Sequence, residues 1–317
     1  MPANLRSVTG DPASAAEVAL AVVHGAMSTT GPVRDRNEDH LGWGPLGASG
    51  LSVVVGSQSE LAPIPLVSVD GPVDAWGPVT GGSAESRGSG MVFSVADGLG
   101  GYGGGDVASS IAVGELLDRF AASDPAVGGA ALLRSGFNAA NQRVFDAALA
   151  GEGARRMQTT LTALVLVSGA AHIGHVGDSR IYRSRGDMLD LLTTDHTQVT
   201  EMLRMHLIRP DQATDHPARH ALTRSLGSEL MVRTDIRTEA LADGDTFLLC
   251  SDGLWSKVRA GEIGEALQSD VRTACEQLIL LAIERGGEDN ATAVAVRVEH
   301  AGRPSERSRS WRRFLPT

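Results

Sequence analysis

Five short acidic motifs are spread along the chain, and each places a carboxylate beside glycine, serine or another polar residue. They are Asn37-Glu38-Asp39, Val95-Ala96-Asp97-Gly98-Leu99-Gly100-Gly101, Val176-Gly177-Asp178-Ser179-Arg180, Cys250-Ser251-Asp252-Gly253-Leu254 and Gly287-Glu288-Asp289-Asn290. Four of them follow or interrupt an apolar, β-prone run. Carboxylates and carbonyls gathered at strand ends form an all-oxygen site, which suits magnesium or manganese and not zinc. The pattern therefore indicates a metal-dependent enzyme that acts on an anionic substrate.

The elements that must position these acids are strands and helices with clear periodicity. Strands are predicted over 18–28, 161–167, 171–176, 180–185, 246–250 and 291–298, and helices over 106–120, 133–148, 198–207, 260–268 and 271–285. Apolar residues four apart, such as Ala108, Ala112 and Leu116, mark the first helix. Two successive helices between strands predict a helical layer that covers a sheet. The 42–90 segment is rich in Gly, Pro and Ser, so we expect much of it to be loop.

Composition narrows the function classes. A chain of 317 residues with 42% hydrophobic residues can bury a sizeable core, in one large domain or two small ones. The net charge of −10 argues against nucleic-acid binding, which requires a basic face, and ordinary solubility accounts for the acidity. Two cysteines, Cys250 and Cys275, form neither a disulfide framework nor a zinc cluster.

The sequence also bears on location. It contains no run of about 18 apolar residues, so we expect no membrane span. The mildly apolar 15–27 stretch lacks a basic leader and a cleavage site, so it does not indicate a signal peptide. We therefore expect a reduced, cytoplasmic setting.

In family order, the motifs resemble those of the metal-dependent protein phosphatases, the PPM or type 2C serine/threonine phosphatases, in their bacterial branch. The matching motifs include four beyond the acidic ones: Arg34-Asp35-Arg36 before Asn37, Thr159-Thr160-Leu161-Thr162-Ala163, Asp195-His196-Thr197 and Leu222-Thr223-Arg224-Ser225-Leu226-Gly227. The resemblance covers about 28–298. It implies an α+β fold, a four-layer α-β-β-α sandwich of two antiparallel sheets flanked by helix pairs, with a dinuclear metal site at one end.

The resemblance also assigns roles to the acids. Asp97 resembles the carboxylate that bridges both Mn²⁺ or Mg²⁺ ions, and the Gly98 carbonyl resembles a ligand of one of them. Asp252 and Asp289 resemble ligands of the other ion. Asp178 resembles a ligand of a third, weaker ion found in bacterial members.

Four more positions acquire roles from the same comparison. Glu38 resembles a carboxylate that acts on the metals directly or through water. Asp39 and Asn290 resemble residues that support the ligands, and Asp39 has two open roles, orienting a ligand or orienting a water. Arg34 resembles the arginine that binds phosphate, which its planar fork can grip through two oxygens.

These roles imply a reaction. Two cations about 3.5–4 Å apart can neutralise a phosphate monoester and hold a bridging water ionised near neutral pH. In-line attack would release serine or threonine, so no Cys or His nucleophile is needed. The expected substrates are phosphorylated Ser/Thr proteins, and the enzyme would oppose a protein kinase.

Two positions depart from the family. Leu99 stands where some eukaryotic members carry a proposed general-acid histidine, and Tyr102 stands where many bacterial members carry a histidine. A water or another group must then protonate the leaving alkoxide. The 195–227 segment resembles a flap beside the active site, and we expect surface and structural roles for its histidines, which are His196, His206, His216 and His220.

We expect three parts: a loose lead-in over 1–16, a phosphatase domain over 17–299 that contains the 42–90 insertion and the 195–227 flap, and a basic, disordered tail over 300–317. The insertion is either inert or touches a substrate or partner, and a weak contact with an anionic surface is the alternative for the tail. We expect a monomer. Two other functions remain open, a phosphatase-like binding module with little turnover and a small-molecule phosphoesterase.

Overall fold

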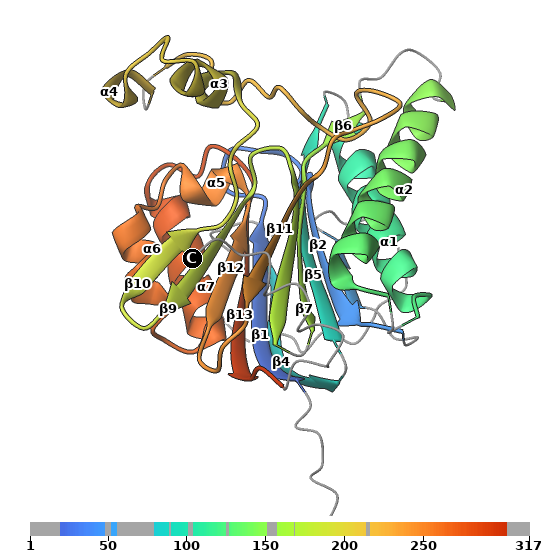
Figure 1. Ribbon diagram of the computed structural model, residues 1–317. Helices are drawn as coiled ribbons and strands as arrows, with labels where there is room; N and C mark the ends of the chain where they lie inside the picture. The colour runs from blue at the N-terminus through green and yellow to red at the C-terminus, as the bar shows by residue number, and fades with distance from the viewer. Residues whose placement is uncertain are drawn as a thin grey trace, which may run out of the picture.

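Two antiparallel sheets pack face to face, with helices on the outer face of each (Figure 1). The computed structural model describes residues 20–47, 52–55, 79–88, 90–100, 104–124, 127–150, 157–167, 169–213 and 216–302. One sheet has the strand order β10 (Met188–Leu191), β9 (Arg180–Arg185), β12 (Thr246–Cys250), β13 (Ala291–His300), β1 (Leu20–Thr29) and β4 (Val79–Gly88). The other has the order β11 (Asp235–Ala240), β8 (Ala170–Val176), β7 (Leu161–Val167), β5 (Gly90–Leu99), β2 (Asp39–Pro45) and β3 (Ser52–Val55), and β6 (Gln158–Thr159) pairs with the end of β5.

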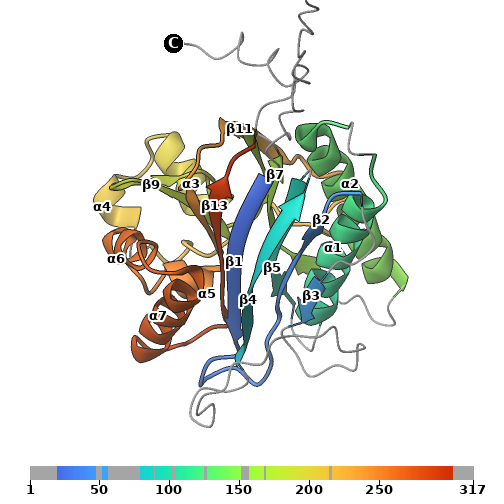
Figure 2. The same ribbon diagram turned by 90° about the horizontal axis from the view of Figure 1, so that it is seen from below.

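The helices form the two outer layers, as the view from below shows (Figure 2). Helices α1 (Gly104–Ala121) and α2 (Gly129–Ala150) cover the second sheet, and α6 (Ala260–Ala266) and α7 (Val271–Glu284) lie on the first. The short α5 (Asp252–Trp255) directly follows β12, while α3 (Gln198–Arg204) and α4 (Pro210–Ala213) stand above one end of the sandwich. This arrangement confirms the predicted four-layer fold.

Three apolar clusters hold the layers together. Between the sheets, Phe93 and Phe247 lie fully buried and face a shared core. On the outer side of the second sheet, Phe137 of α2 belongs to a separate cluster, and Leu278 of α7 anchors the third against the first sheet. Burying such a side chain stabilises the fold by about 1.5–3 kcal/mol. Cys250 is also fully buried in the third cluster, as a small core residue.

The predicted long helices and the buried strands are confirmed with small shifts at their ends. The helix predictions rested on apolar residues spaced four apart. In α1 these residues are buried against the sheet: Ala108, Ala112, Leu116 and Phe120. The helix expected over 198–207 ends earlier, at Arg204. Neither β10 nor β11 was predicted. Both strands lie at sheet edges and are only partly buried, so their sequences lack a strong apolar pattern.

The expectation that 42–90 is mostly loop is wrong at its two ends. Strand β2 runs to Pro45, and β4 occupies ten residues that pair with β1 along its whole length. The β4 sequence contains Gly and Ser in place of β-branched residues, which hid the strand. Deletion of 50–89 would therefore remove β4, the partner of β1, and we expect the fold not to tolerate it.

Several predictions concern residues outside the described ranges. These are the lead-in over 1–16, most of the basic tail and Tyr102. Among the helices that the structure describes, none combines the length and apolarity that a bilayer crossing requires.

Candidate metal centre

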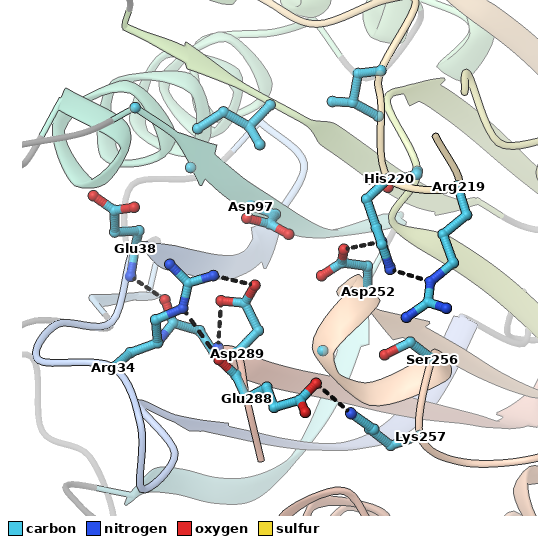
Figure 3. Close-up of a pocket in the computed structure, with 17 residues that line it drawn as sticks. Arg34, Glu38, Asp97, Arg219, His220, Asp252, Ser256, Lys257, Glu288 and Asp289 are labelled. Carbon is cyan, nitrogen blue, oxygen red and sulfur yellow. Dashed lines mark hydrogen bonds and ion pairs between the residues drawn. The ribbon is translucent and has the colours of Figure 1, made fainter. Parts of the chain in front are cut away.

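All of the predicted site residues except Asp39 meet in one cavity of about 610 Å³ at the end of the sandwich (Figure 3). Asp97 comes from β5, Asp178 from the turn between β8 and β9, Asp252 from the first position of α5, and Asp289 from the residues just before β13. Arg34, Glu38, Gly98 and Asn290 line the same cavity. Residues up to 255 positions apart thus share one site because the antiparallel strands end at the same edge.

Glycines let two backbone segments approach this cavity. A Cβ at Gly98 would collide with the carbonyl oxygens of Gly105 and Glu38, and a Cβ at Gly253 would collide with the carbonyl oxygen of Asn290. The aspartate-glycine pairs of these motifs therefore follow from close packing beside each acid.

The backbone of Asp97 is held by the Thr159-Thr160 motif. The Asp97 amide donates to Thr160 Oγ1 at 2.9 Å, and Thr159 Oγ1 donates to the Asp97 carbonyl at 2.8 Å. Thr160 also lies 2.8 Å from Ser179 Oγ, next to Asp178. Two of the acidic loops are thereby fixed to one another, which explains why this motif accompanies the acidic ones.

Asp39 lies behind the cavity and does not line it. Its Oδ2 accepts hydrogen bonds from Ser251 Oγ and Thr292 Oγ1, both at 2.6 Å. Its Oδ1 is buried and has no hydrogen-bond partner among the residues that the structure describes. Burial, together with the charges of Asp252 and Asp289, raises the pKa of Asp39 to about 7 against the opposing effect of the two hydroxyls.

Burial and neighbouring charges also raise the pKa values of acids that line the cavity. Burial raises the pKa of Asp97 well above its usual value, and the charges of Asp39 and Asp252 add to the effect. Burial and Asp252 likewise raise the pKa of Asp178. A buried group of carboxylates that repel one another suits divalent cations. A bound cation attracts each carboxylate and so offsets both their burial and their mutual repulsion.

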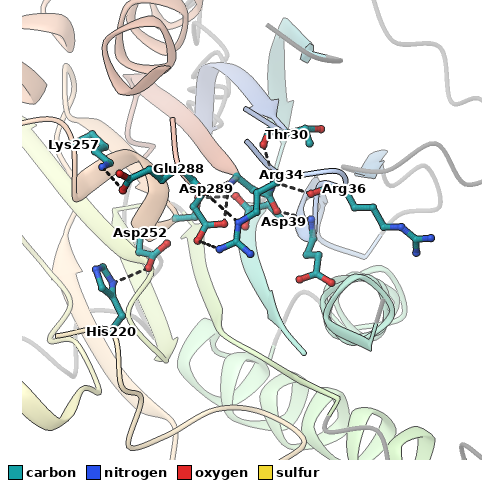
Figure 4. A network of polar contacts seen from close by, with 12 residues as sticks. Thr30, Arg34, Arg36, Asp39, His220, Asp252, Lys257, Glu288 and Asp289 are labelled. Atoms are coloured by element: carbon teal, nitrogen blue, oxygen red, sulfur yellow. Dashed lines mark hydrogen bonds and ion pairs between the residues drawn. The ribbon is translucent and has the colours of Figure 1, made fainter. Parts of the chain in front are cut away.

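Arg34 occupies the mouth of the cavity, where its guanidinium bonds Asp289 Oδ2 at 2.6 Å and the Glu288 carbonyl at 3.2 Å (Figure 4). Both side chains of this pair are half exposed, at 50% and 42%. The pKa of Asp289 is nevertheless raised, because burial and the charge of Asp252 outweigh Arg34. The arginine therefore lies beside a predicted metal ligand and close enough to solvent to meet an incoming anion.

Asn290 fastens the loop that carries Arg34 and Glu38. Its Oδ1 accepts from the Glu38 amide at 2.8 Å, and its Nδ2 donates to the carbonyls of Arg36 and Thr30 at 2.8 and 3.0 Å. Burial raises the pKa of Glu38, which points into the cavity rim from this loop.

Comparison with known proteins decides the family. A family model described as protein phosphatase 2C matches residues 74–279. The chain is 36% identical to the serine/threonine phosphatase stp of Listeria innocua over 222 residues, which cover 68% of this chain and 88% of that protein.

The chain belongs to the protein phosphatase 2C family.

Further relatives of this phosphatase agree. Protein phosphatase PhpP of Streptococcus pneumoniae is 34% identical over 67% of this chain and 87% of its own length. The crystal structure of Mycobacterium tuberculosis PstP/Ppp is similar with a TM-score of 0.70 and 29% identity, covering 89% of this chain and all of that one. A second structure, of the PstP catalytic domain with two manganese ions, has a TM-score of 0.66 at 28% identity and covers 88% of this chain and 99% of that one. The phosphatase therefore has the fold and the donor set of a dinuclear manganese or magnesium site.

The flap histidines of this phosphatase divide into two kinds. His196 is structural as expected: it is 4% exposed, its Nδ1 accepts from the Gly177 amide at 3.0 Å, and its Nε2 faces Asp235 at 3.3 Å. His220 differs, because its exposed side chain lines the cavity and its Nδ1 lies 3.1 Å from Asp252 Oδ2. Its spacing to Asp252 in the sequence carries no signal, because the flap folds back over the site.

Leu99 also lines the cavity of the phosphatase, at the position where a general-acid histidine was sought. An aliphatic side chain cannot transfer a proton. The leaving group must therefore be protonated by water or by another cavity residue.

Proposed function

We propose that this phosphatase removes phosphate from serine and threonine side chains of proteins with the help of two divalent cations, Mn²⁺ or Mg²⁺. It is a metal-dependent serine/threonine protein phosphatase. The observation that carries this proposal is the convergence of Asp97, Asp252 and Asp289 in one cavity with Arg34 at its mouth. No acid of the set is missing, which weighs against a binding module without turnover.

Different acids would bind different cations. Asp97, at the end of β5, would contact both ions, with the Gly98 carbonyl beside it, while Asp252 and Asp289 would hold one of them. Glu38 would reach the ions from the rim, and the cations, when bound, neutralise phosphate charge and activate water. Asp39 and Asn290 keep the ligand loops in place through the hydrogen bonds described above.

Arg34 would bind the phosphate. A guanidinium offers two parallel N–H donors to two phosphate oxygens. The same donors bond Asp289 and the Glu288 carbonyl, so a cation held by Asp289 would compete for this carboxylate and free the donors for the substrate. Arg34 therefore exchanges a carboxylate partner for a phosphate partner as the site fills.

The biological setting follows from this chemistry. Phosphoserine and phosphothreonine in proteins are made by protein kinases, so the enzyme would reverse the action of one. We propose a catalytic domain over 17–299 that acts as a monomer in the cytoplasm, with Asp178 as a ligand of a third, weaker ion.

Hydrolysis of para-nitrophenyl phosphate and of a phosphothreonine peptide by the full chain tests the proposal, with manganese, magnesium or EDTA. We expect phosphate release from the peptide that requires a cation and stops in EDTA. Turnover of the small ester without the peptide would favour a small-molecule phosphoesterase. A folded protein that is inactive with either cation would favour the binding module.

A further inference from the structure

The flap reaches the metal centre through a single imidazole. His220 Nδ1 lies 3.1 Å from Asp252 Oδ2, and Arg219 Nε donates to His220 Nε2 at 2.8 Å (Figure 3). Because Nε2 accepts this bond, the neutral ring carries its proton on Nδ1 and donates it to Asp252. His220 thus approaches a proposed metal ligand with the nitrogen that could itself bind a cation.

A third residue completes the group. Asp178, His220 and Asp252 each offer a ligand atom, and the three atoms lie within 4.8 Å of one another. Asp178 is only 4% exposed, whereas the His220 side chain is 41% exposed. The group therefore has one buried face, on the turn before β9, and one exposed face, on the flap.

Trp255 aligns these ligands. Its indole Nε1 donates to the Asp178 carbonyl at 2.9 Å, and the His220 ring stacks on it with an interplanar angle of 29°. On the same indole the Arg180 guanidinium lies 3.5 Å from the ring centroid. Asp195 holds Arg180 through two hydrogen bonds of 2.7 and 3.0 Å. The indole is thus tied to Asp178 and supports the flap residue.

We propose that His220 is a ligand, carried by the flap, of a third divalent cation that Asp178 and Asp252 hold beside the dinuclear centre. The proposal rests on the proposed function, and it adds the nitrogen ligand and the link to the flap. A cation at this position replaces the proton between Nδ1 and Asp252. The ring proton then resides on Nε2, and the exposed Arg219 turns away from it.

Two consequences follow from the donor set. One imidazole among carboxylates favours borderline ions such as Mn²⁺ or Zn²⁺ over Mg²⁺, which prefers oxygen alone. The cation also joins the flap to the strand-borne acids, so occupancy of this position closes the 216–222 segment onto the cavity.

Calorimetric titration of the EDTA-treated full chain with Mn²⁺, and separately with Mg²⁺, tests this site without any substrate. We expect three Mn²⁺ ions per wild-type chain. His220→Ala should keep the two tighter ions and weaken the third by at least about tenfold, the lower range for a disrupted metal site. His216→Ala is the matched control, since His216 lies on the same flap and its side chain accepts a hydrogen bond from the nearby Ala218 amide.

Hydrogen exchange of the 216–222 segment supplies a second readout. Mn²⁺ should slow exchange there in the wild type and in His216→Ala, and should have little effect in His220→Ala. His220→Asn places an amide oxygen near the Nδ1 position, so it should retain a third ion and lose the preference for Mn²⁺ over Mg²⁺.

The outcomes separate the two proposals. Equal third-ion affinity in the wild type and His220→Ala, with two tight ions in both, would overturn the ligand role and leave the phosphatase proposal standing. Fewer than two ions in the wild type would instead contradict the dinuclear centre itself.

Discussion

The two sides of the metal centre are built in different ways. On the strand side, Asp39 is buried and Asp97 is partly buried, and both have raised pKa values. Hydroxyl groups bond the Asp97 backbone and the Asp39 side chain. On the flap side, His220 and Arg219 are exposed and contact the centre mainly through Asp252 and Trp255. One side is positioned before any cation arrives, and the other can adjust.

The difference shows which side of the centre lowers the stability of the fold. Burying several carboxylates together destabilises the metal-free fold, and the surrounding core must offset that cost. The exposed flap residues impose no such cost, because water solvates them when they leave the centre. Variants on the strand side should therefore change both stability and catalysis, whereas variants on the flap side should change ion and substrate binding.

Asp97→Asn should have the largest effect on activity. An amide cannot hold two cations as a carboxylate does, so kcat should fall by about 1,000-fold, which corresponds to roughly 4 kcal/mol of lost stabilisation. The measurement is manganese-dependent hydrolysis of a phosphothreonine peptide, with exposed Asp118→Asn on α1 as the control. Activity near the wild-type level in a folded Asp97→Asn protein would remove Asp97 from the centre.

The same variant should be more stable than the wild type in EDTA, most clearly at high pH. The folded-state pKa of Asp97 is raised above its unfolded value, so its ionisation destabilises the fold as pH rises above the unfolded pKa. The gap in Tm between variant and wild type should grow from pH 5 to pH 8. Buried His24, His40 and His175, whose pKa values burial lowers to about 4, 4 and 3, destabilise both proteins alike at low pH and cancel in the gap.

Thermal unfolding in EDTA at a series of pH values measures this gap, and saturating Mn²⁺ provides the control. With the cation bound, the wild type should become the more stable protein, because it binds the ion more tightly. A gap that stays constant with pH would show that Asp97 ionises in the folded state as it does in the unfolded chain.

Arg34→Ala should raise KM for the phosphopeptide by about tenfold or more, since charge-assisted hydrogen bonds contribute about 1.5–3 kcal/mol each. The same change should tighten Mn²⁺ binding, because Arg34 competes with the cation for Asp289. Steady-state kinetics and calorimetry measure the two effects. Lys257→Ala, which removes a rim charge paired with Glu288, is the control and should alter KM little.

Ser251→Ala should weaken Mn²⁺ binding by about tenfold, the smallest effect of the series. The serine hydroxyl donates to Asp39 and touches no substrate, so loss of the bond loosens the support of the strand side. Ser94→Ala is matched in burial and lies within β5 away from the cavity. Equal Mn²⁺ affinity in the two variants would show that Asp39 does not need this hydroxyl.

Part of this centre could be predicted because its signal is local. Four of the five acidic motifs border an apolar run, several acids stand beside glycine or serine, and the motifs occur in the order of a known family. The edge strands were harder: β4 is rich in Gly and Ser, and its strand conformation comes from pairing with β1. Pairing between distant segments can override weak local preference.

The sequence alone determined the chemistry of the strand side: which acids gather, which cations suit them and which reaction follows. Only the tertiary structure decided the flap side. His220 and Asp252 are 32 residues apart with no periodic relation, and they meet because the flap folds over Trp255. Local sequence patterns reflect the interactions of a segment with its neighbours in the chain. A contact across the cavity depends instead on where the whole sandwich places both segments.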